Sequence, residues 1–168
     1  MKLSVSLGMA VNAHPAVESF VQQMAVRPPE HLDEIVAEKD AEVWQEVKCL
    51  ECANCCKTMT PRFSDEDVAR ISKYLDLDED AFRRKYLLQY STGEWVNLAV
   101  PCQFLQSDNK CSIYEQRPEV CAGFPYHLDG LFSKHKEQLA KRSLSCPATY
   151  RLLMKLQSAL GNMLGSEA

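Results

Sequence analysis

The stretch Cys49-Leu50-Glu51-Cys52-Ala53-Asn54-Cys55-Cys56 places four of the chain's eight cysteines in the pattern C-x2-C-x2-C-C. In a chain of 168 residues with this cysteine content, such fixed spacing follows a given cysteine by chance about once in 10⁴ cases. Two thiolates separated by two residues can both reach one ion at about 2.3 Å without straining the backbone between them. The spacing therefore predicts a metal site, and it leaves the identity of the metal open.

The way in which these four thiols divide depends on the backbone that carries them. In a continuous helix, at about 100° per residue, Cys49, Cys52 and Cys56 fall within about 60° of one another, and Cys55 points elsewhere. In an irregular loop, Cys52 and Cys55 form a second pair, and Cys56 is left over. In both cases we expect three of the four to share one centre, while the fourth serves a second centre or is simply buried.

Four further cysteines stand where ligands would be useful. Cys102 and Cys111 lie at the base of a predicted hairpin, close enough to act as a pair. Cys121 and Cys146 lie in or just before the first turns of predicted helices, where unpaired N–H groups favour thiolate. The predicted metal ligands are therefore all eight cysteines: Cys49, Cys52, Cys55, Cys56, Cys102, Cys111, Cys121 and Cys146. Nearby basic residues should lower the thiol pKa values, and they are Lys48, Lys57, Lys110 and Arg117.

The rest of the chain predicts one domain preceded by an arm. We interpret residues 1–30 as a mobile or loosely docked N-terminal arm, because their apolar run is too interrupted to be a good export signal. The domain follows over 31–165, with a motif core at 49–121 and a C-terminal helix at 147–164. Further helices are expected over 31–47, from Ser64, from Asp78 and from Pro118.

The middle of the chain predicts a small β element. Residues 94–100 are typical of a strand, and 102–105 and 110–114 of a hairpin with a turn between them. The acidic residues Asp65–Asp67 are interpreted as a solvated helix start, and His127 as a structural or surface residue. The predicted fold class is α+β: a single small, mostly helical domain with a minor β-hairpin or strand element, organised around the cysteine metal site.

Charge and hydropathy restrict the partners and the compartment. Lys plus Arg number 19 against 23 Asp plus Glu, which gives a net charge of −4. An acidic chain without a basic tract is a poor binder of nucleic acid or anionic membranes, and no stretch approaches the roughly 18 apolar residues of a membrane span. The predicted partner is a metal ion, with no nucleic acid, no membrane and an unknown protein partner. The predicted compartment is the reducing cytoplasm.

Three of these segments together resemble the YkgJ-like cysteine-cluster family, a zinc- or iron-chelating domain named for CxxCxxCC. They are 49–56, Pro101-Cys102-Gln103-Phe104-Leu105, and the run from Cys111 to Cys121. The resemblance implies metal chelation by the seven cysteines up to Cys121, with Tyr114, Arg117 and Pro118 as family-typical neighbours. Ala122 stands where relatives often carry a basic residue, and residues 1–45 lie outside the resemblance.

The sequence is compatible with two functions. The first is a non-catalytic metal-binding protein with zinc, or else iron, as its ion. The second is an iron–sulfur protein with a [4Fe-4S] cluster, because Cys49-x2-Cys52-x2-Cys55 with the distant Cys146-Pro147 is similar to a ferredoxin ligand run. Its role would be electron transfer or, through the family's remote relation to flagellin lysine N-methylase, methyl transfer.

Two other classes are less favoured. The sequence has no GxSxG, HExxH or P-loop motif, so an enzyme is the less favoured class. A secreted, disulfide-linked domain would need an export signal, and the adjacent Cys55 and Cys56 also argue against it.

Overall fold

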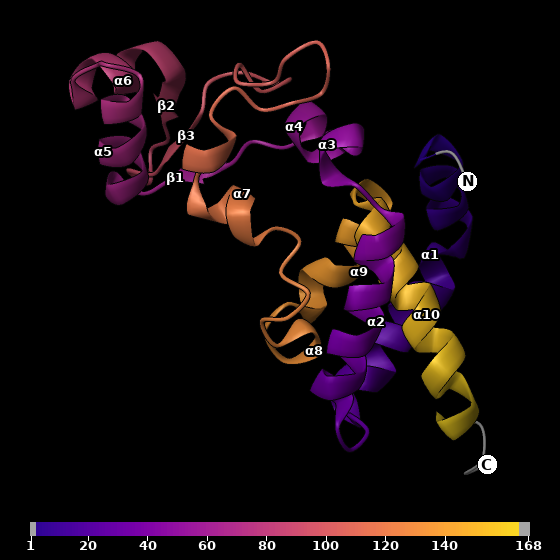
Figure 1. The fold of residues 1–168 in the computed structure, drawn as a ribbon. Helices are drawn as coiled ribbons and strands as arrows, with labels where there is room; N and C mark the ends of the chain where they lie inside the picture. Colours follow the sequence, from indigo (N-terminus) through magenta and orange to yellow (C-terminus); the bar gives the residue numbers. More distant parts are fainter. Residues whose placement is uncertain (1–2, 165–168) are drawn as a thin grey trace. The chain divides into compact units, whose positions relative to one another are not determined.

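The computed structural model describes residues 3–164, and these fall into two compact units (Figure 1). The helical unit is built from the chain up to Lys48 and again from Pro125 onward. The cysteine unit, Cys49–Phe124, is inserted between these two parts of the sequence. Seven of the eight cysteines therefore belong to one unit, and Cys146 belongs to the other.

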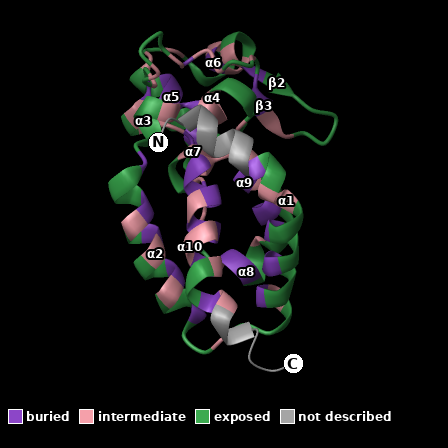
Figure 2. Cartoon of the chain, turned by 90° about the vertical axis from the view of Figure 1, so that its right-hand side faces the viewer, coloured by how far each residue is buried: buried purple, intermediate pink, exposed green. Residues whose placement is uncertain are grey.

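Two long terminal helices and α2 form most of the helical unit. Its elements are α1 (Leu3–Val26), α2 (Leu32–Glu46), α8 (Leu131–Lys134), α9 (Lys136–Ser145) and α10 (Pro147–Leu164). The predicted helices over 31–47 and 147–164 are confirmed as α2 and α10. Figure 2 shows exposed residues along the outer side of α1. The buried side of α10 carries Leu152, Leu153, Leu156 and Leu160.

Helix α1 differs from the arm predicted for residues 1–30. Val17, Phe20, Val21 and Met24 are buried in the core of the helical unit, at the i, i+3, i+4, i+7 spacing of one helix face. Burying four such side chains stabilises the unit by about 1.5–3 kcal/mol each, which is enough to fix a helix against its neighbours. The sequence analysis interpreted this segment as an arm because its apolar run is interrupted, and it did not test the segment for a helical apolar stripe.

The cysteine unit combines short helices with a three-stranded sheet. Its helices are α3 (Cys49–Cys52), α4 (Asn54–Thr58), α5 (Asp65–Tyr74), α6 (Glu79–Tyr86), η1 (Tyr114–Gln116) and α7 (Glu119–Gly123). Its strands are β1 (Arg62–Phe63), β2 (Leu87–Gln89) and β3 (Trp95–Asn97), in the antiparallel order β1-β3-β2. The mostly helical α+β class is thereby confirmed.

Side-chain caps begin both α5 and α6 where the sequence predicts. The Ser64 hydroxyl accepts a hydrogen bond from the Asp67 amide at 3.1 Å, and the Asp67 carboxylate accepts one from the Ser64 amide at 3.2 Å. The Asp78 carboxylate accepts a hydrogen bond from the Ala81 amide at 2.7 Å. Each cap satisfies N–H groups that a helix start leaves without partners.

The predicted hairpin over 102–114 is reduced to one isolated bridge between Leu105 and Cys111. The predicted strand over 94–100 is present but covers only β3, which pairs with β1 on one side and β2 on the other. Pro101 offers no amide hydrogen to a continuing ladder. The segment after β3 is therefore a loop, and the loop brings two cysteines toward the core.

The core of the cysteine unit combines aromatic and aliphatic side chains, and part of that loop packs against it. Its buried members are Phe63, Val68, Ile71, Phe82, Leu87, Phe104 and Ile113, and Cys102 and Cys111 pack against it. The ring of Phe82, which is fully buried, lies with its centre 6.1 Å from the centre of Phe63 and 5.3 Å from that of Tyr86. The side of the loop that carries the thiols is thus anchored by packed rings.

Removing the Phe82 ring should destabilise the cysteine unit specifically. The cavity left by Phe82→Ala is expected to lower the free energy of unfolding of this unit by about 3–5 kcal/mol. Amide exchange of α5 and α6 in increasing urea measures this value. Tyr74→Ala, at a position that is 57% exposed, is the control and should cost less than about 1 kcal/mol. An equal decrease in the free energy of unfolding in the two variants would contradict the assignment of Phe82 to this core.

Candidate metal centre

The backbone of the CxxCxxCC stretch is two short helices with a break between them. Ala53 separates α3 from α4 in the left-handed region, at φ 49°, a conformation that costs a non-glycine residue about 1–2 kcal/mol. Two hydrogen bonds hold this turn, from the Ala53 amide to the Cys49 carbonyl at 3.0 Å and from the Lys57 amide to the Ala53 carbonyl at 3.1 Å. The grouping expected for a continuous helix, with Cys55 pointing elsewhere, therefore differs from the structure.

Three thiols of this stretch form a hydrogen-bonded chain. Cys55 is hydrogen-bonded to both Cys49 and Cys56, and the Sγ atoms of Cys55 and Cys56 are 4.0 Å apart. Two thiolates on one tetrahedral ion, each at about 2.3 Å, stand about 3.8 Å apart. The adjacent cysteines are therefore spaced as two ligands of the same ion would be.

The central thiol of this chain keeps its proton and stabilises the thiolates on either side. Its hydrogen bond lowers the pKa of Cys49 to about 6, against the opposing effect of burial, with a smaller contribution from the charge of Arg117. The same interaction lowers the pKa of Cys56 to about 7. The hydrogen bonds with its two neighbours and its burial raise the pKa of Cys55.

A backbone hydrogen bond brings the loop after β3 against this stretch. The Cys102 amide donates to the Cys56 carbonyl at 2.8 Å, although 46 positions separate the two residues (102 − 56). The Cys102 thiol lies 3.9 Å from the Asn97 side-chain oxygen, and Asn97 is itself buried at the end of β3. The Leu105 amide bonds back to the Cys102 carbonyl, and the bridge from Leu105 to Cys111 places the next cysteine alongside.

Four thiols from three segments influence one another electrostatically. Burial raises the pKa of Cys121 to about 12, and the negative charges of Cys56, Cys102 and Cys111 raise it further. Burial likewise raises the pKa of Cys102 and of Cys111, and in both cases the charge of Cys56 adds to the effect. Cys56 is thus the member shared by this group and by the hydrogen-bonded chain.

The donor set fits a thiophilic cation, although its atoms are not gathered around one point. Among residues 3–164, no three His, Cys, Asp or Glu side chains stand in the arrangement of a closed metal site. None of the eight cysteines is in a disulfide. Cys146 is partly buried against the core of the helical unit, and Cys52 ends α3 half-buried. Soft thiolate donors in this number suit zinc or iron.

A buried carboxylate, missed by the sequence analysis, positions the segment that leads to Cys121. Asp67 is only 2% exposed, so the solvated helix start predicted for Asp65–Asp67 is wrong at this residue. Its Oδ1 atom lies 2.6 Å from Nη2 of Arg70 and accepts a hydrogen bond from the Glu119 amide at 3.1 Å. Arg70 also donates to the Arg117 carbonyl at 3.1 Å. The capping-box spacing indicates the local bond of Asp67, but not its long-range partner.

His127 is a structural residue of the helical unit, as predicted. Its Nδ1 atom lies 2.6 Å from Asp40 Oδ1, and its Nε2 atom lies 3.0 Å from the Thr149 hydroxyl. The indole of Trp44 donates to the other oxygen of Asp40 at 3.0 Å. Although a carboxylate, an imidazole and a hydroxyl lie in line, Thr149 is fully buried, so its hydroxyl cannot reach a substrate. The network joins α2, the segment after the cysteine unit, and α10.

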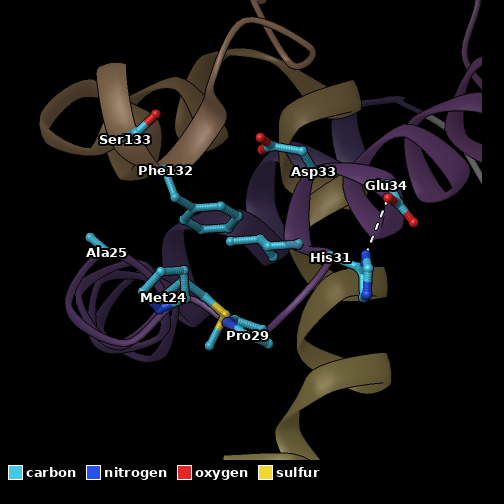
Figure 3. A pocket seen from close by; sticks show the side chains of 10 residues that line it. Met24, Ala25, Pro29, His31, Asp33, Glu34, Phe132 and Ser133 are labelled. Atoms are coloured by element: carbon cyan, nitrogen blue, oxygen red, sulfur yellow. Dashed lines mark hydrogen bonds and ion pairs between the residues drawn. The ribbon is translucent and has the colours of Figure 1, made fainter.

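A cavity of about 450 Å³ lies in the helical unit and is distinct from the thiol cluster (Figure 3). Met24, Leu32 and Phe132 line its apolar part, and Asp33 and Glu34 stand on its polar side. The dashed line in Figure 3 marks the 3.2 Å contact between His31 and Glu34. The ten lining residues include no cysteine, so the cavity contributes no thiol to a metal site.

With this arrangement of thiols, the chain fits the class of cysteine-cluster metal-binding proteins. Residues 48–147 match the model of the CxxCxxCC family, described as a "Putative zinc- or iron-chelating domain". The match covers more than half of the sequence, and the chain belongs to this family.

The comparison with individual proteins gives a relative without a described role. The chain is 32% identical over 83 residues to the uncharacterized protein MJ0661 of Methanocaldococcus jannaschii. The aligned region covers 48% of this chain and 44% of that protein, so the chain spans less than half of the relative's length. No solved structure matches the sequence. None of the helices in the described part of the chain has the length and apolar character needed to cross a membrane.

The thiol pKa values predict an order of alkylation in the metal-free protein. At about pH 7, Cys49 is exposed and mostly thiolate, whereas Cys121 is half-buried and protonated. Because the thiolate is the reactive form, iodoacetamide should modify Cys49 first and Cys121 last, as followed by peptide mass spectrometry. In urea the two rates should become similar. Equal rates in the folded protein would contradict the arrangement.

The buried imidazole predicts a loss of stability in mild acid. Burial lowers the pKa of His127, against the opposing effect of its hydrogen bond to Asp40 and with a smaller contribution from Arg142. The folded protein therefore binds a proton less readily than the unfolded chain, whose histidine has a pKa near 6.5. The stabilisation is complete above about pH 6.5 and decreases as the pH falls toward the lower pKa of the folded state.

Urea unfolding of the helical unit at about pH 7.5 and about pH 5 measures this dependence. His127→Gln should cost about 1–3 kcal/mol at the higher pH, because Asp40 or Thr149 loses a buried partner. It should also show a smaller decrease between the two pH values than the unmodified protein. His31→Gln, at an exposed histidine of the same unit, is the matched control and should behave like the unmodified protein. An unchanged pH dependence in His127→Gln would be inconsistent with this role.

Proposed function

We propose that the cysteine unit binds zinc in a thiolate centre formed by Cys56, Cys102, Cys111 and Cys121. The supporting observation is the hydrogen bond from the Cys102 amide to the Cys56 carbonyl at 2.8 Å, which brings two distant cysteine segments together. The mutual electrostatic effects of the four thiols also support this grouping. Cys49, Cys52 and Cys55 precede Cys56 in the same stretch and lie outside this proposed set of four ligands.

A divalent cation would allow these buried thiols, which lie near one another, to lose their protons. Burial and neighbouring negative charge raise the pKa of Cys102, Cys111 and Cys121, so these groups stay protonated near neutral pH without a cation. A coordinated metal reverses this preference, because a thiol bound to zinc loses its proton. Binding at neutral pH should therefore release protons.

The centre we propose is structural and does not catalyse hydrolysis. Four thiolates close the coordination sphere of zinc and leave no position for an activated water. The bound ion would join α4, the loop after β3 and α7, and structural zinc contributes about 10 kcal/mol or more to folding in small model systems. Because the ligands must stay reduced, we propose the cytoplasm as the compartment. Cys146, in the core of the other unit, is not included in the ligand set.

Metal analysis of two single-cysteine variants tests this assignment. Protein purified without oxygen should contain zinc in stoichiometric amount, and Cys56→Ser should lower its zinc affinity by at least about 100-fold, because it removes a first-sphere ligand. Cys146→Ser is the matched control and should retain the zinc of the unmodified protein. Zinc is measured by elemental analysis, and affinity by competition with a chromogenic chelator.

Several results would overturn the proposal. The detection of iron and acid-labile sulfide, with a broad absorption at about 400 nm, would show that the unit holds an iron–sulfur cluster and not a zinc centre. Equal affinities in Cys56→Ser and Cys146→Ser would show that Cys56 is not a ligand. The absence of tightly bound metal in the unmodified protein would contradict metal binding by this unit altogether.

A further inference from the structure

Strand β2 lies at an edge of the three-stranded sheet, because the strand order is β1-β3-β2. Its hydrogen bonds to the neighbouring strand come from alternate residues, and the ladder continues to the Tyr90 amide, which donates to the Glu94 carbonyl at 2.9 Å. The backbone groups of successive residues point to opposite sides of a strand. Those of Leu87 and Gln89 therefore point away from β3, toward the open edge.

Donor and acceptor groups of the backbone are both present on this open edge. The Leu87 amide is already used, because it donates to the Arg83 carbonyl at the end of α6. In the described chain, residues 3–164, no hydrogen bond reaches the Leu87 carbonyl, the Gln89 amide or the Gln89 carbonyl. Unpaired backbone groups on an edge strand are a template on which another strand can pair.

Large apolar side chains are exposed beside this edge. Leu88 and Tyr90 are two positions apart, so they lie on the same face of β2, and each is 48% exposed. Leu88 is paired with Val96, and residues paired across a ladder share a face. Leu98 follows Val96 by two positions, is 52% exposed, and extends the ladder through its amide, which donates to the Tyr86 carbonyl at 3.0 Å. Leu88, Tyr90 and Leu98 thus form an apolar patch next to the open edge.

Basic residues stand directly before β2, at the end of α6. The first of them, Arg83, forms ion pairs with Asp65 at 3.0 Å and with Glu79 at 3.1 Å. Arg84 and Lys85 follow it and are exposed. Neither of these two forms an ion pair in the part of the chain that the structure describes. The end of the open edge where β2 begins therefore carries a positive charge that an acidic partner would complement.

A second copy of this chain would not supply the complementary charge. Antiparallel pairing of two β2 edges sets Arg84 opposite Thr92 or Glu94 of the other copy, depending on the register. Thr92 is uncharged, and Glu94 is already paired with Arg62 at 2.6 Å. Basic residues beside an edge strand also disfavour edge-to-edge pairing between copies. The surface therefore fits a different protein.

We propose that the open edge of β2 binds an extended segment of a partner protein as a fourth, antiparallel strand. The segment has apolar side chains at alternate positions, against Leu88 and Tyr90, and carboxylates toward its C-terminal end, against Arg84 and Lys85. Main-chain hydrogen bonds provide the pairing, and the alternate side chains provide selectivity. None of the residues that form this surface is a cysteine, so the inference is independent of the proposed zinc centre.

A synthetic peptide tests the chemistry of the partner. The probe is the acetylated peptide Thr-Ile-Thr-Val-Thr-Glu-Glu, added to the full-length protein as purified, and a second peptide ends in two lysines instead. In backbone amide NMR spectra, the acidic peptide should shift the signals of residues 87–90. The basic peptide should bind at least about tenfold more weakly, because it meets Arg84 and Lys85 with like charge. A higher salt concentration should reduce this difference.

Methylated peptides test the backbone pairing. In the proposed register, the amide of the third residue of the probe donates to the Gln89 carbonyl, and the amide of the fourth residue points away from β2. N-methylation of the third residue should weaken binding by about tenfold, because it removes this donor. N-methylation of the fourth residue is the control and should change the affinity by less than about twofold. Equal effects of the two methyl groups would contradict strand addition.

Charge variants of the protein provide a matched comparison. Reversal of both cations, Arg84→Glu together with Lys85→Glu, should weaken binding of the acidic peptide by at least about tenfold and reverse the preference in favour of the basic peptide. Lys73→Glu reverses an exposed cation at the end of α5 in the same unit, and its affinities should stay within about twofold of those of the unmodified protein. A reversed preference cannot arise from loss of the fold.

Several results would overturn this proposal. They include the absence of shifts at residues 87–90 at millimolar peptide, and equal affinity for the acidic and basic peptides. Dimerisation of the full-length protein in analytical ultracentrifugation, reversed by the acidic peptide, would assign the edge to a second copy and would overturn it as well. None of these results involves zinc, so the proposed zinc centre would be unaffected by them.

Discussion

Half-buried thiols that lie beside one another cannot all lose their protons unless a cation compensates their charge. This constraint governs the cysteine unit, where burial raises the pKa of Cys102, Cys111 and Cys121 at the same time. Cys55 meets the constraint locally by keeping a proton and sharing it with its two neighbours. For Cys102, Cys111 and Cys121 burial outweighs the local hydrogen bonds, and a thiophilic ion is the group whose charge would compensate all three together.

The scaffold around the thiols is held mainly by interactions that involve no sulfur. The Asp67 carboxylate binds Arg70 and the Glu119 amide, and this clamp orients the chain that leads to α7. Cys102 and Cys111 pack against a core that includes the ring of Phe82 and the ring of Phe104, which comes from the same loop. The cysteine segments are thus held by buried charge and by packed rings, and the proposed ion would draw together thiols that are not gathered around one point in residues 3–164.

The sequence predicted those features that depend on neighbouring residues. The caps at Ser64 and Asp78 are local, and both helices begin where the pattern placed them. The cysteine spacing likewise identified the family. The left-handed turn at Ala53 was not predictable, because alanine carries no turn signal. Strands β1 and β2 were missed because two or three residues are too short to show an alternating pattern.

Long-range partners were the other features that the sequence could not predict. The acidic run that contains Asp67 is typical of a solvated helix start. The fold brings the Glu119 amide, 52 positions away, to the Asp67 carboxylate. The hydrogen bond from the Cys102 amide to the Cys56 carbonyl could not be predicted from the sequence either, because nearly every residue type supplies these backbone atoms. The sequence therefore predicted the residue types of the candidate site, but it did not predict the contacts that bring those residues together.

The region shared with the family is not the whole of the folded protein. The match over 48–147 includes His127, but its two hydrogen-bond partners, Asp40 and Thr149, lie on either side of that region. A chain confined to the match would lack both hydrogen-bond partners of the His127 imidazole. It would also lack α1, α2 and nearly all of α10, which supply most of the core of the helical unit. The flanking helices are therefore part of the folded helical unit, although they lie outside the match.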